Sequence, residues 1–190
     1  MQKIIQKEFL NHIEASQITI DSISNLIEKS AICCINSLKN DGKILIFGNG
    51  GSAADAQHIA AELIGRFKIE RKGLAAIALT TDTSTITSIS NDYGYSKVFS
   101  RQVEALANPK DVVIGISTSG NSINVNKALI KAKNIGCKVI GFSGGDGGEM
   151  QHHCDVNVFV PVKDTPRVQE MHILIGHIIC HLIDIEFNAI

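Results

Sequence analysis

A run of apolar residues leads directly into a glycine turn at Lys43-Ile44-Leu45-Ile46-Phe47-Gly48-Asn49-Gly50-Gly51-Ser52. The run is short and rich in branched aliphatic residues, as in a buried strand, and the residues from Ser52 to Arg66 have a helical period. Glycines in such a turn permit positive φ and a close approach of the backbone to a ligand, and Ser52 can cap the helix. The stretch therefore predicts a strand, a turn and a helix, with the turn facing an anionic or polyhydroxylated ligand.

The same alternation recurs along the rest of the chain. Further strands are expected at 75–80, 111–116, 138–142 and 155–160, and further helices at 95–107, 123–134 and 165–187. The N-terminal residues, from about 3 to 39, have a helical period and are expected to form a helical hairpin. This order predicts an α/β fold, in which a five-stranded parallel sheet is covered by helices, within one domain spanning residues 1–190.

The composition excludes several classes of protein. Hydrophobic residues make up 44% of the chain and charged residues 19%, which excludes extended disorder and favours an oligomer that covers part of the apolar surface. The net charge is -1 and there is no lysine or arginine run, so we expect no nucleic-acid partner. Five scattered cysteines without a CxxC pair fit a reducing compartment, and neither a signal peptide nor a long uncharged apolar run is evident. We therefore expect a cytoplasmic protein without a membrane partner.

A second turn, rich in hydroxyl groups, follows the strand expected at 111–116. It reads Ser117-Thr118-Ser119-Gly120-Asn121-Ser122 and opens the next helix. Backbone N–H groups and hydroxyls at a helix N-terminus form a phosphate cradle that needs no lysine. The glycine turn also satisfies the dinucleotide pattern G-x-G-x-x-A, but Glu70 falls before the next strand, so a nicotinamide cofactor is not expected. A purely structural turn is the alternative at both places.

Three ionisable side chains share one stripe of the helix expected at 52–66. Asp55, His58 and Glu62 fall within about 60° of one another around the helix axis. His58 and Glu62 can chelate one metal ion, or Glu62 can act as a carboxylate base beside the phosphate site. An exposed polar face with an i,i+4 contact is the alternative.

The helix expected at 165–187 carries Gln169, His172, His177 and His181 in an otherwise apolar sequence. Such a helix is buried, so each histidine is either a core residue or a site residue. Gln169 and His177 can converge on one ligand only if their side chains lean toward each other, whereas His177 and His181 form an i,i+4 pair. Periodicity alone does not choose between the two pairs.

The two turns occur together with the motifs Ala61-Glu62-Leu63, Ser90-Asn91-Asp92-Tyr93-Gly94-Tyr95 and Arg167-Val168-Gln169-Glu170-Met171-His172. In this combination the chain resembles, over essentially its whole length, the phosphoheptose isomerases of the sugar isomerase (SIS) domain superfamily. The resemblance implies a flavodoxin-like SIS domain that forms a homotetramer, with sites between subunits and an oligomeric role for residues 1–40. It also implies conversion of sedoheptulose 7-phosphate to D-glycero-D-manno-heptose 7-phosphate, the first step toward the ADP-heptoses of bacterial surface saccharides.

The resemblance also implies roles for individual residues. The acid/base pair maps onto Glu62 and His177, and the ligands of one zinc ion per subunit map onto His58, Glu62, Gln169 and His177, which leaves out His181. One departure is Pro166, which stands where some of these enzymes have an acidic residue and affects any polar contact made there. Substrate contacts are implied for Asn49, Gly50, Gly51, Ser52, Glu62, Asn91, Asp92, Ser117, Thr118, Ser119, Ser122 and Gln169.

The chemistry of such a reaction fits these residues independently of the resemblance. Moving a proton between adjacent carbons through an enediol requires a base, an acid and a group that holds the developing oxyanion. Glu62 can take the proton from C1 and His177 can shuttle protons on the oxygens. A phosphate held at Ser117 to Ser122 would position the reacting carbons.

Two other functions occur on the same fold. One is a non-enzymatic protein that binds the bacterial replication initiator and lacks the acid/base pair, so the presence of Glu62 and His177 favours the enzyme. The other is an isomerase of another sugar phosphate, such as an N-acetylmuramate or hexose phosphate, which assays with candidate substrates would distinguish.

Overall fold

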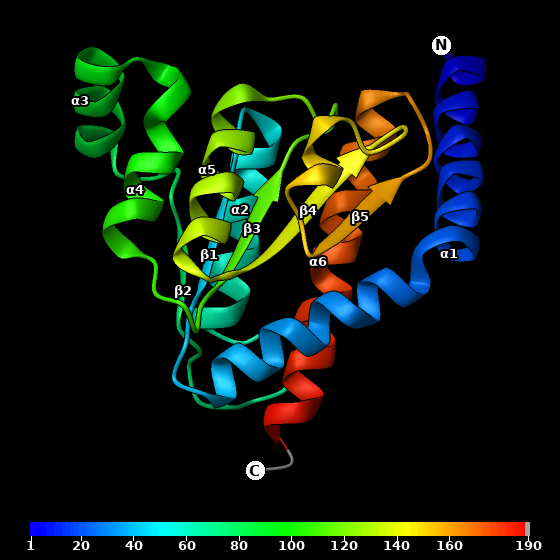
Figure 1. Ribbon diagram of the computed structural model, residues 1–190. Helices are drawn as coiled ribbons and strands as arrows, with labels where there is room; N and C mark the ends of the chain where they lie inside the picture. Colours follow the sequence, from blue (N-terminus) through cyan, green and yellow to red (C-terminus); the bar gives the residue numbers. More distant parts are fainter. Residues whose placement is uncertain (189–190) are drawn as a thin grey trace.

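The computed structural model describes residues 1–188 as a parallel sheet between layers of helices (Figure 1). The elements in chain order are α1 (Gln2–Lys39), β1 (Ile44–Gly48), α2 (Gly51–Ile64), β2 (Ala76–Ala78), α3 (Thr83–Tyr93), η1 (Tyr95–Lys97), α4 (Val98–Leu106), β3 (Val112–Ile116), α5 (Ile123–Ile135), β4 (Lys138–Gly144), η2 (Glu149–His152), β5 (Val156–Val160) and α6 (Thr165–Asn188). The α/β class and the strands expected from the sequence are confirmed.

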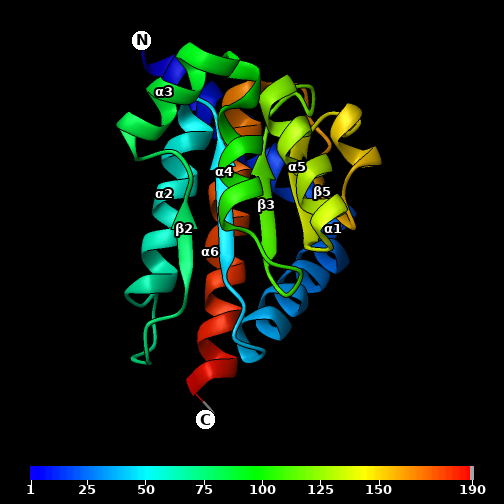
Figure 2. The ribbon, with the colours of Figure 1, turned by 60° about the vertical axis from the view of Figure 1, so that its left-hand side comes forward.

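All neighbouring strands are parallel, in the order β2-β1-β3-β4-β5. Strands β1 and β3 therefore lie side by side in the middle of the sheet (Figure 2). The carboxyl ends of parallel strands meet at one edge, and the turns after β1 and β3 are the two that the sequence analysis identified. The topology thus brings both turns to the same place.

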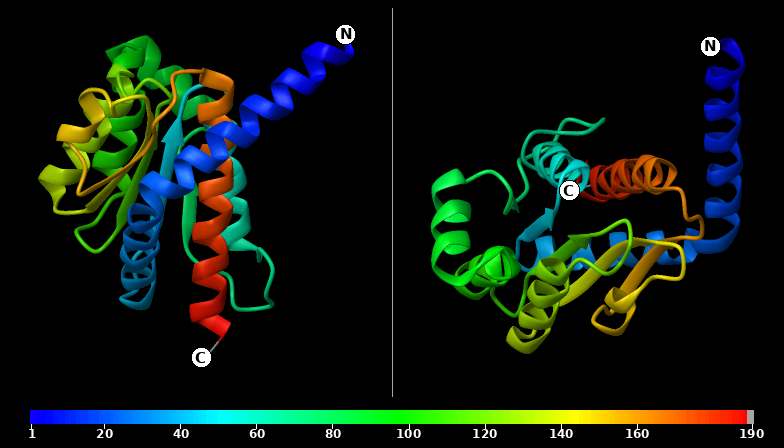
Figure 3. Two further views of the ribbon diagram at one scale, coloured as in Figure 1. Left: turned by 90° about the vertical axis from the view of Figure 1, so that its right-hand side faces the viewer. Right: turned by 90° about the horizontal axis from the view of Figure 1, so that it is seen from above.

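The sheet has an apolar layer on each face, as the nearly continuous apolar strands require. In β1, Ile44 and Ile46 pack into the core shared with α1, α2 and α6, while Leu45 and Phe47 pack into the core shared with α4 and α5. This alternation follows from the two-residue period of a strand. Figure 3 shows α2 and α6 on one side of the sheet and α5 on the other.

The N-terminal region is one helix of 38 residues, so the expected helical hairpin is wrong. Residues 2–39 contain no glycine or proline, and without such a residue nothing ends the helix. The helix is bent instead, and its first part projects away from the sheet (Figure 3). The hydroxyls of Thr19, Ser22 and Ser24 donate to carbonyls four residues earlier, a contact that bends helices.

Helix α3 was not expected from the sequence, because its serines and threonines are poor helix formers. Its first turn is capped by Asp82, whose carboxylate accepts hydrogen bonds from the Thr85 amide at 3.0 Å and the Thr85 hydroxyl at 2.7 Å. None of the 11 described residues of α3 is buried. The helix therefore depends on its cap and on hydroxyl hydrogen bonds together with the partly buried Ile86, which packs against the core.

Helix α6 is long and apolar enough to cross a membrane by length and composition alone. Half of its most apolar window is buried inside the fold, however, and Ile175, Ile179 and Ile183 lie in the core. A buried core helix of a globular domain passes the same test.

His172 on α6 is completely buried. Its Nε2 lies 2.9 Å from the Ser143 carbonyl oxygen, and within the described residues its Nδ1 has no hydrogen-bond partner. Burial lowers the pKa of His172 to about 4, although the contact with the Ser143 carbonyl opposes this. His172 is therefore a neutral core residue, one of the two alternatives that the sequence left open.

We predict that His172 makes the fold less stable in acid. Its pKa is about 4 in the folded chain, against an ordinary value of 6.5, so between these values the unfolded chain binds more protons. Its contribution to stability is complete above pH 6.5 and decreases by about 1.4 kcal/mol per pH unit as the pH falls toward 4. Urea unfolding at a series of pH values, at fixed protein concentration, compares the wild type with His172→Gln. Equal pH slopes in the two proteins would contradict the prediction.

Candidate active site

The candidate site begins where β1 and β3 end together. Gly48 pairs with Ile116 in the register of the two strands, so the turns that follow start side by side. A Cβ on Gly48 would lie 2.7 Å from the Ser52 Cβ and 2.8 Å from the Ile116 carbonyl oxygen. Only glycine permits so close an approach, and it is what allows α2 to start directly above the strand ends.

The glycine turn is covered by a side chain from α6. Gly50 precedes α2 with φ 56°, in the left-handed region that favours glycine. A Cβ on Gly51 would lie only 1.9 Å from the Gln169 Nε2, so the Gln169 amide lies against the backbone of the turn. The structure therefore brings together Gly50, Gly51 and Gln169, three of the predicted substrate-binding residues. Ser52, at the start of α2, is buried next to them in the chain.

The hydroxyl-rich turn is held in place from several sides. The hydroxyls of Ser117 and Ser122 are 2.9 Å apart and form a hydrogen bond across the turn. Gly120 has φ 67°, and a Cβ there would lie 2.3 Å from the Gly147 carbonyl oxygen. Thr118 and Ser119 border an open hollow of about 480 Å³, which Lys163 also lines. The turn is thus preformed, with hydroxyls and one cation facing open space.

An amide pair joins the two turns. The side-chain amides of Asn49 and Asn124 exchange two hydrogen bonds, of 2.9 and 2.8 Å. The Tyr95 hydroxyl also donates to the Asn49 Oδ1, at 3.0 Å. The sequence pattern assigned no role to Tyr95 or to Asn124. Asn124 could have been identified, because it lies in the first turn of the helix that follows the hydroxyl-rich turn. These contacts fix the orientation of Asn49, a predicted substrate contact.

Close packing of α2 on α6 brings the remaining residues together. A Cβ on Gly176 would lie 2.6 Å from the Ile59 Cδ1, so the two helices approach where α6 has no side chain. Each of these residues is adjacent to a histidine of the predicted site. His58 and His177 consequently face each other across the helix contact, with their Nε2 atoms 3.1 Å apart.

Glu62 completes a cluster with these two histidines. Its Oε1 lies 3.1 Å from the His58 Nε2, and the candidate ligand atoms of His58, Glu62 and His177 all lie within 4.8 Å of one another. Periodicity had left open whether His177 acts with Gln169 or with His181. The structure places it with α2, while His181 lies at the edge of the Phe67 ring, 6.3 Å between ring centroids.

The surroundings of His177 favour its neutral form. Burial lowers the pKa of His177, and the nearby His58 and Lys68 lower it further, whereas Glu62 raises it. The Phe67 ring stacks on the imidazole with 5.0 Å between centroids and an angle of 19° between planes. Phe67 lies in an irregular segment after α2, where no pattern in the sequence indicated a role. A neutral imidazole held in this way can accept or relay a proton.

Asp55 lies behind the cluster on the same stripe of α2. It is 8% exposed, and within the described residues its Oδ2 has no hydrogen-bond partner. Burial raises the pKa of Asp55 to about 6, and contacts with His58 and Gln169 oppose that rise. Asp55 therefore connects the glycine-turn part of the site with the histidine part.

The donor atoms of the cluster fit a metal ion. The His58 Nε2 faces both the Glu62 carboxylate and the His177 Nε2. A hydrogen on the His58 Nε2 could serve both contacts only as a shared, three-centre hydrogen bond, whereas two imidazole nitrogens and a carboxylate oxygen are also a donor set that zinc accepts. Tetrahedral zinc ligands are separated by roughly 3.4 Å, close to the 3.1 Å that separates the His58 Nε2 from the Glu62 Oε1 and from the His177 Nε2. Gln169 was also predicted as a ligand; its amide lies against Gly51, and that role stays a prediction.

Two predicted substrate contacts do not reach the cluster within one chain. Asn91 and Asp92 lie near the end of α3, where the Asn91 amide donates to the Asp92 carboxylate at 2.8 Å. Among the hydrogen bonds and ion pairs of residues 1–188, none joins either residue to the cluster. Figure 1 shows α3 beyond α4, at the side of the domain away from α6.

Comparison with known proteins gives consistent results. The family model of the SIS domain matches residues 8–144. A phosphoheptose isomerase of Aliarcobacter butzleri (strain RM4018) is 58% identical over 188 residues, which cover 99% of this chain and 100% of that protein. One from Helicobacter pylori (strain P12) is 58% identical over 184 residues, covering 97% of this chain and 96% of that protein. The solved phosphoheptose isomerase of Neisseria gonorrhoeae is 46% identical, with a TM-score of 0.92, covering 96% of this chain and 98% of that chain.

We predict that the amide pair between the turns contributes to stability. Asn124→Ala leaves Asn49 without its partner and is expected to lower the free energy of unfolding by about 1–3 kcal/mol. The matched control is Asn134→Ala, an exposed asparagine near the other end of α5, with an expected change below about 0.5 kcal/mol. Urea denaturation measures both. Equal effects of the two substitutions would show that the pair is energetically unimportant.

Proposed function

The chain belongs to the phosphoheptose isomerases of the SIS domain family, and we propose that it converts sedoheptulose 7-phosphate to D-glycero-D-manno-heptose 7-phosphate. The observation that carries this proposal is the meeting of Glu62 and His177, from two different helices, in one cluster within 4.8 Å. Two turns suited to a phosphate and to sugar hydroxyls lie at the carboxyl edge of the sheet, and Glu62 lies about 16 Å along α2 from the glycine turn. The reaction is the first step toward the ADP-heptoses of bacterial surface saccharides.

The acid/base steps follow from the protonation states of the two residues. Glu62 takes a proton from C1 of the ketose, and the resulting enediol receives a proton at C2 to give the aldose. His177 relays protons between the two oxygens, a role for which its neutral form is suited because it has one N–H group and one lone pair. Positioned acid/base groups of this kind typically contribute a factor of about 10² to 10⁴ to the rate.

In this proposal the two turns bind the substrate. The backbone N–H groups at the start of α5, with Ser117, Thr118, Ser119 and Ser122, are suited to the phosphate, and the glycine turn with Ser52 and Gln169 is suited to the sugar. Because both turns are preformed, little ordering is needed when the substrate binds. Remote binding of the phosphate then helps to place the reacting carbons beside Glu62.

A zinc ion, one per subunit, is part of the proposal. His58, Glu62 and His177 would hold it, with Gln169 as the expected fourth ligand. When bound, zinc supplies Lewis acidity that polarises substrate oxygens. The support comes from the convergence of two imidazole nitrogens and one carboxylate oxygen within 4.8 Å of one another.

We also propose a homotetramer with sites between subunits. The projecting part of α1 exposes large apolar side chains, and an apolar groove of about 380 Å³ runs between α1 and α6, lined among others by Ile20, Leu174 and Ile178. A site shared between subunits would also give Asn91 and Asp92 a place beside a cluster that they do not reach within one chain. The exposed apolar side chains of α1 include Ile4, Ile5, Phe9, Leu10 and Ile13.

A reducing cytoplasm fits the cysteines. All five lie in the described part of the chain and are free thiols. Burial raises the pKa of all five, to about 11 at Cys137 and about 12 at Cys154 and Cys180, which keeps the thiols protonated and unreactive.

We predict that turnover depends on both members of the acid/base pair. Incubation of the wild type with sedoheptulose 7-phosphate yields an aldose, whereas Glu62→Gln and His177→Ala lower kcat by a factor of about 10² to 10⁴. Matched controls are Glu104→Gln on α4 and His152→Ala in η2, whose side chains are exposed and which lie on elements outside the cluster. Near wild-type kcat in either cluster variant would remove the acid/base assignment.

We predict that bound zinc depends on His58. After loading with zinc and removal of excess metal, the wild type retains up to about one ion per chain, and His58→Ala loses most of it because only one imidazole and one carboxylate of the cluster remain. Elemental analysis measures the content, with His152→Ala as the control. A wild-type protein that binds no zinc under these conditions would refute the metal proposal.

A further inference from the structure

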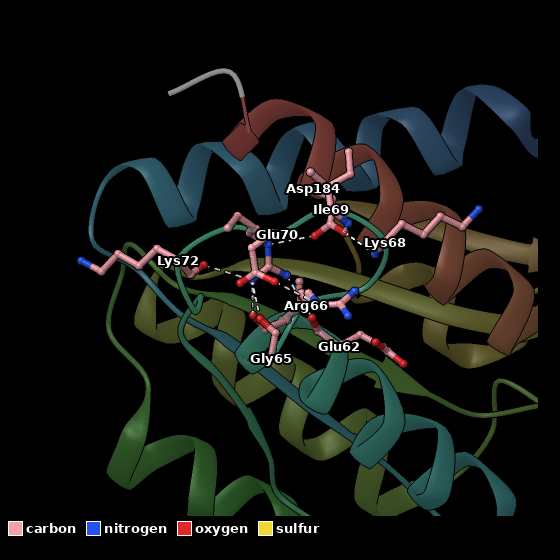
Figure 4. A network of polar contacts seen from close by, with 10 residues as sticks. Glu62, Gly65, Arg66, Lys68, Ile69, Glu70, Lys72 and Asp184 are labelled. Carbon is pink, nitrogen blue, oxygen red and sulfur yellow. Dashed lines mark hydrogen bonds and ion pairs between the residues drawn. The ribbon is translucent and has the colours of Figure 1, made fainter.

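The segment between α2 and β2 is held by a buried ion pair. Arg71 donates from its Nε to the Asp184 Oδ1 at 2.8 Å, and the two side chains are only 1% and 0% exposed. Asp184 lies on α6, two helical turns beyond His177. Figure 4 shows Asp184 beside the segment of Lys68 and Ile69, with the surrounding polar contacts.

Arg71 also binds the end of the helix that carries Glu62. Its Nη2 donates to the Glu62 carbonyl oxygen at 2.9 Å, and its Nη1 donates to the carbonyl oxygens of Leu63 at 2.8 Å and Gly65 at 3.2 Å. These carbonyls belong to the last turn of α2, where the helix itself supplies no donors. One guanidinium therefore joins the Glu62 end of α2 to α6.

Asp184 holds the same segment from the other side. Its Oδ2 accepts hydrogen bonds from the backbone N–H groups of Lys68 at 2.7 Å and Ile69 at 3.0 Å. The residue directly before Lys68 is Phe67, the ring that stacks on His177. Fixing the backbone at Lys68 and Ile69 therefore fixes where the Phe67 ring lies.

We propose that Arg71 and Asp184 are positioning residues for the isomerase, because they set the spacing between Glu62 and His177 and hold Phe67 against the imidazole. This inference rests on the proposed function. A buried ion pair adds little net stability compared with apolar packing, so stability alone does not account for the contacts. The arrangement of the contacts accounts for them instead. Arg71 joins the segment after α2 to the end of α2, and Asp184 joins the same segment to α6.

The expected consequence is a selective loss of kcat. Misplacing reacting groups by about 1 Å can lower a rate about 100-fold, whereas substrate binding depends on turns that the pair does not touch. Asp184→Asn and Phe67→Leu are therefore expected to lower kcat about 10- to 100-fold, with KM changed less than about threefold. Phe67→Tyr keeps an aromatic ring at this position, so its kcat is expected to stay close to that of the wild type. Wild-type kcat in both Asp184→Asn and Phe67→Leu would overturn the proposal.

The matched control is a second buried carboxylate with the same pattern of contacts. Asp111, directly before β3, is 1% exposed and accepts hydrogen bonds from the backbone N–H groups of Lys43 and Asn108 and from the Lys43 ammonium. Asp111→Asn removes a comparable buried charge but is expected to leave kcat within about twofold. An equal loss of kcat in Asp111→Asn and Asp184→Asn would assign the effect to general destabilisation and overturn the proposal.

A readout without turnover separates this inference from the proposed function. A stacked Phe67 shifts the ring-proton resonance of His177, which is assigned by its absence in His177→Ala. Phe67→Leu is expected to remove this ring-current shift, Asp184→Asn to change it, and Asp111→Asn to preserve it. An unchanged His177 resonance in Asp184→Asn would overturn the positioning role. Absence of turnover in the wild type, with these resonance changes present, would refute the isomerase and leave the positioning of His177 in place.

Discussion

The contact of Ile59 with the bare backbone at Gly176 is the constraint on which the candidate site depends. It determines how closely α2 approaches α6, and every member of the histidine and glutamate cluster belongs to one of these two helices. The same approach allows Gln169, further up α6, to lie on the glycine turn. Close-packed interiors deform little, so a distance set in the core is transmitted to the surface where the chemistry takes place.

The site divides into two parts that are held by different means. Its ligand-binding turns emerge from β1 and β3, where strand pairing and the amide pair of Asn49 and Asn124 fix them. Its reactive side chains are carried by helices, whose relative position depends on side-chain packing and on the buried pair of Arg71 and Asp184. The two turns and the reactive side chains are therefore held in place by different structural elements.

Much of the fold could be predicted from the sequence because its strands are short apolar runs that end in glycine or hydroxyl groups. The same reasoning failed where the determinants are local and polar: α3 depends on the Asp82 cap, and α1 continues because no residue ends it. Within the site, the two turns and the stripe of His58 and Glu62 follow from the pattern. The choice of His177 and the role of Phe67 do not, since both depend on how distant elements pack.

Arg71 contacts the end of α2 through main-chain carbonyl oxygens, not through side chains. A carbonyl oxygen is present whatever amino acid occupies the position, so these hydrogen bonds do not depend on which side chains the last turn of α2 carries. Side-chain substitutions in the last turn of α2, Glu62 included, therefore leave these three hydrogen bonds in place. The chemistry at this end of the helix could thus change in evolution without a new scaffold.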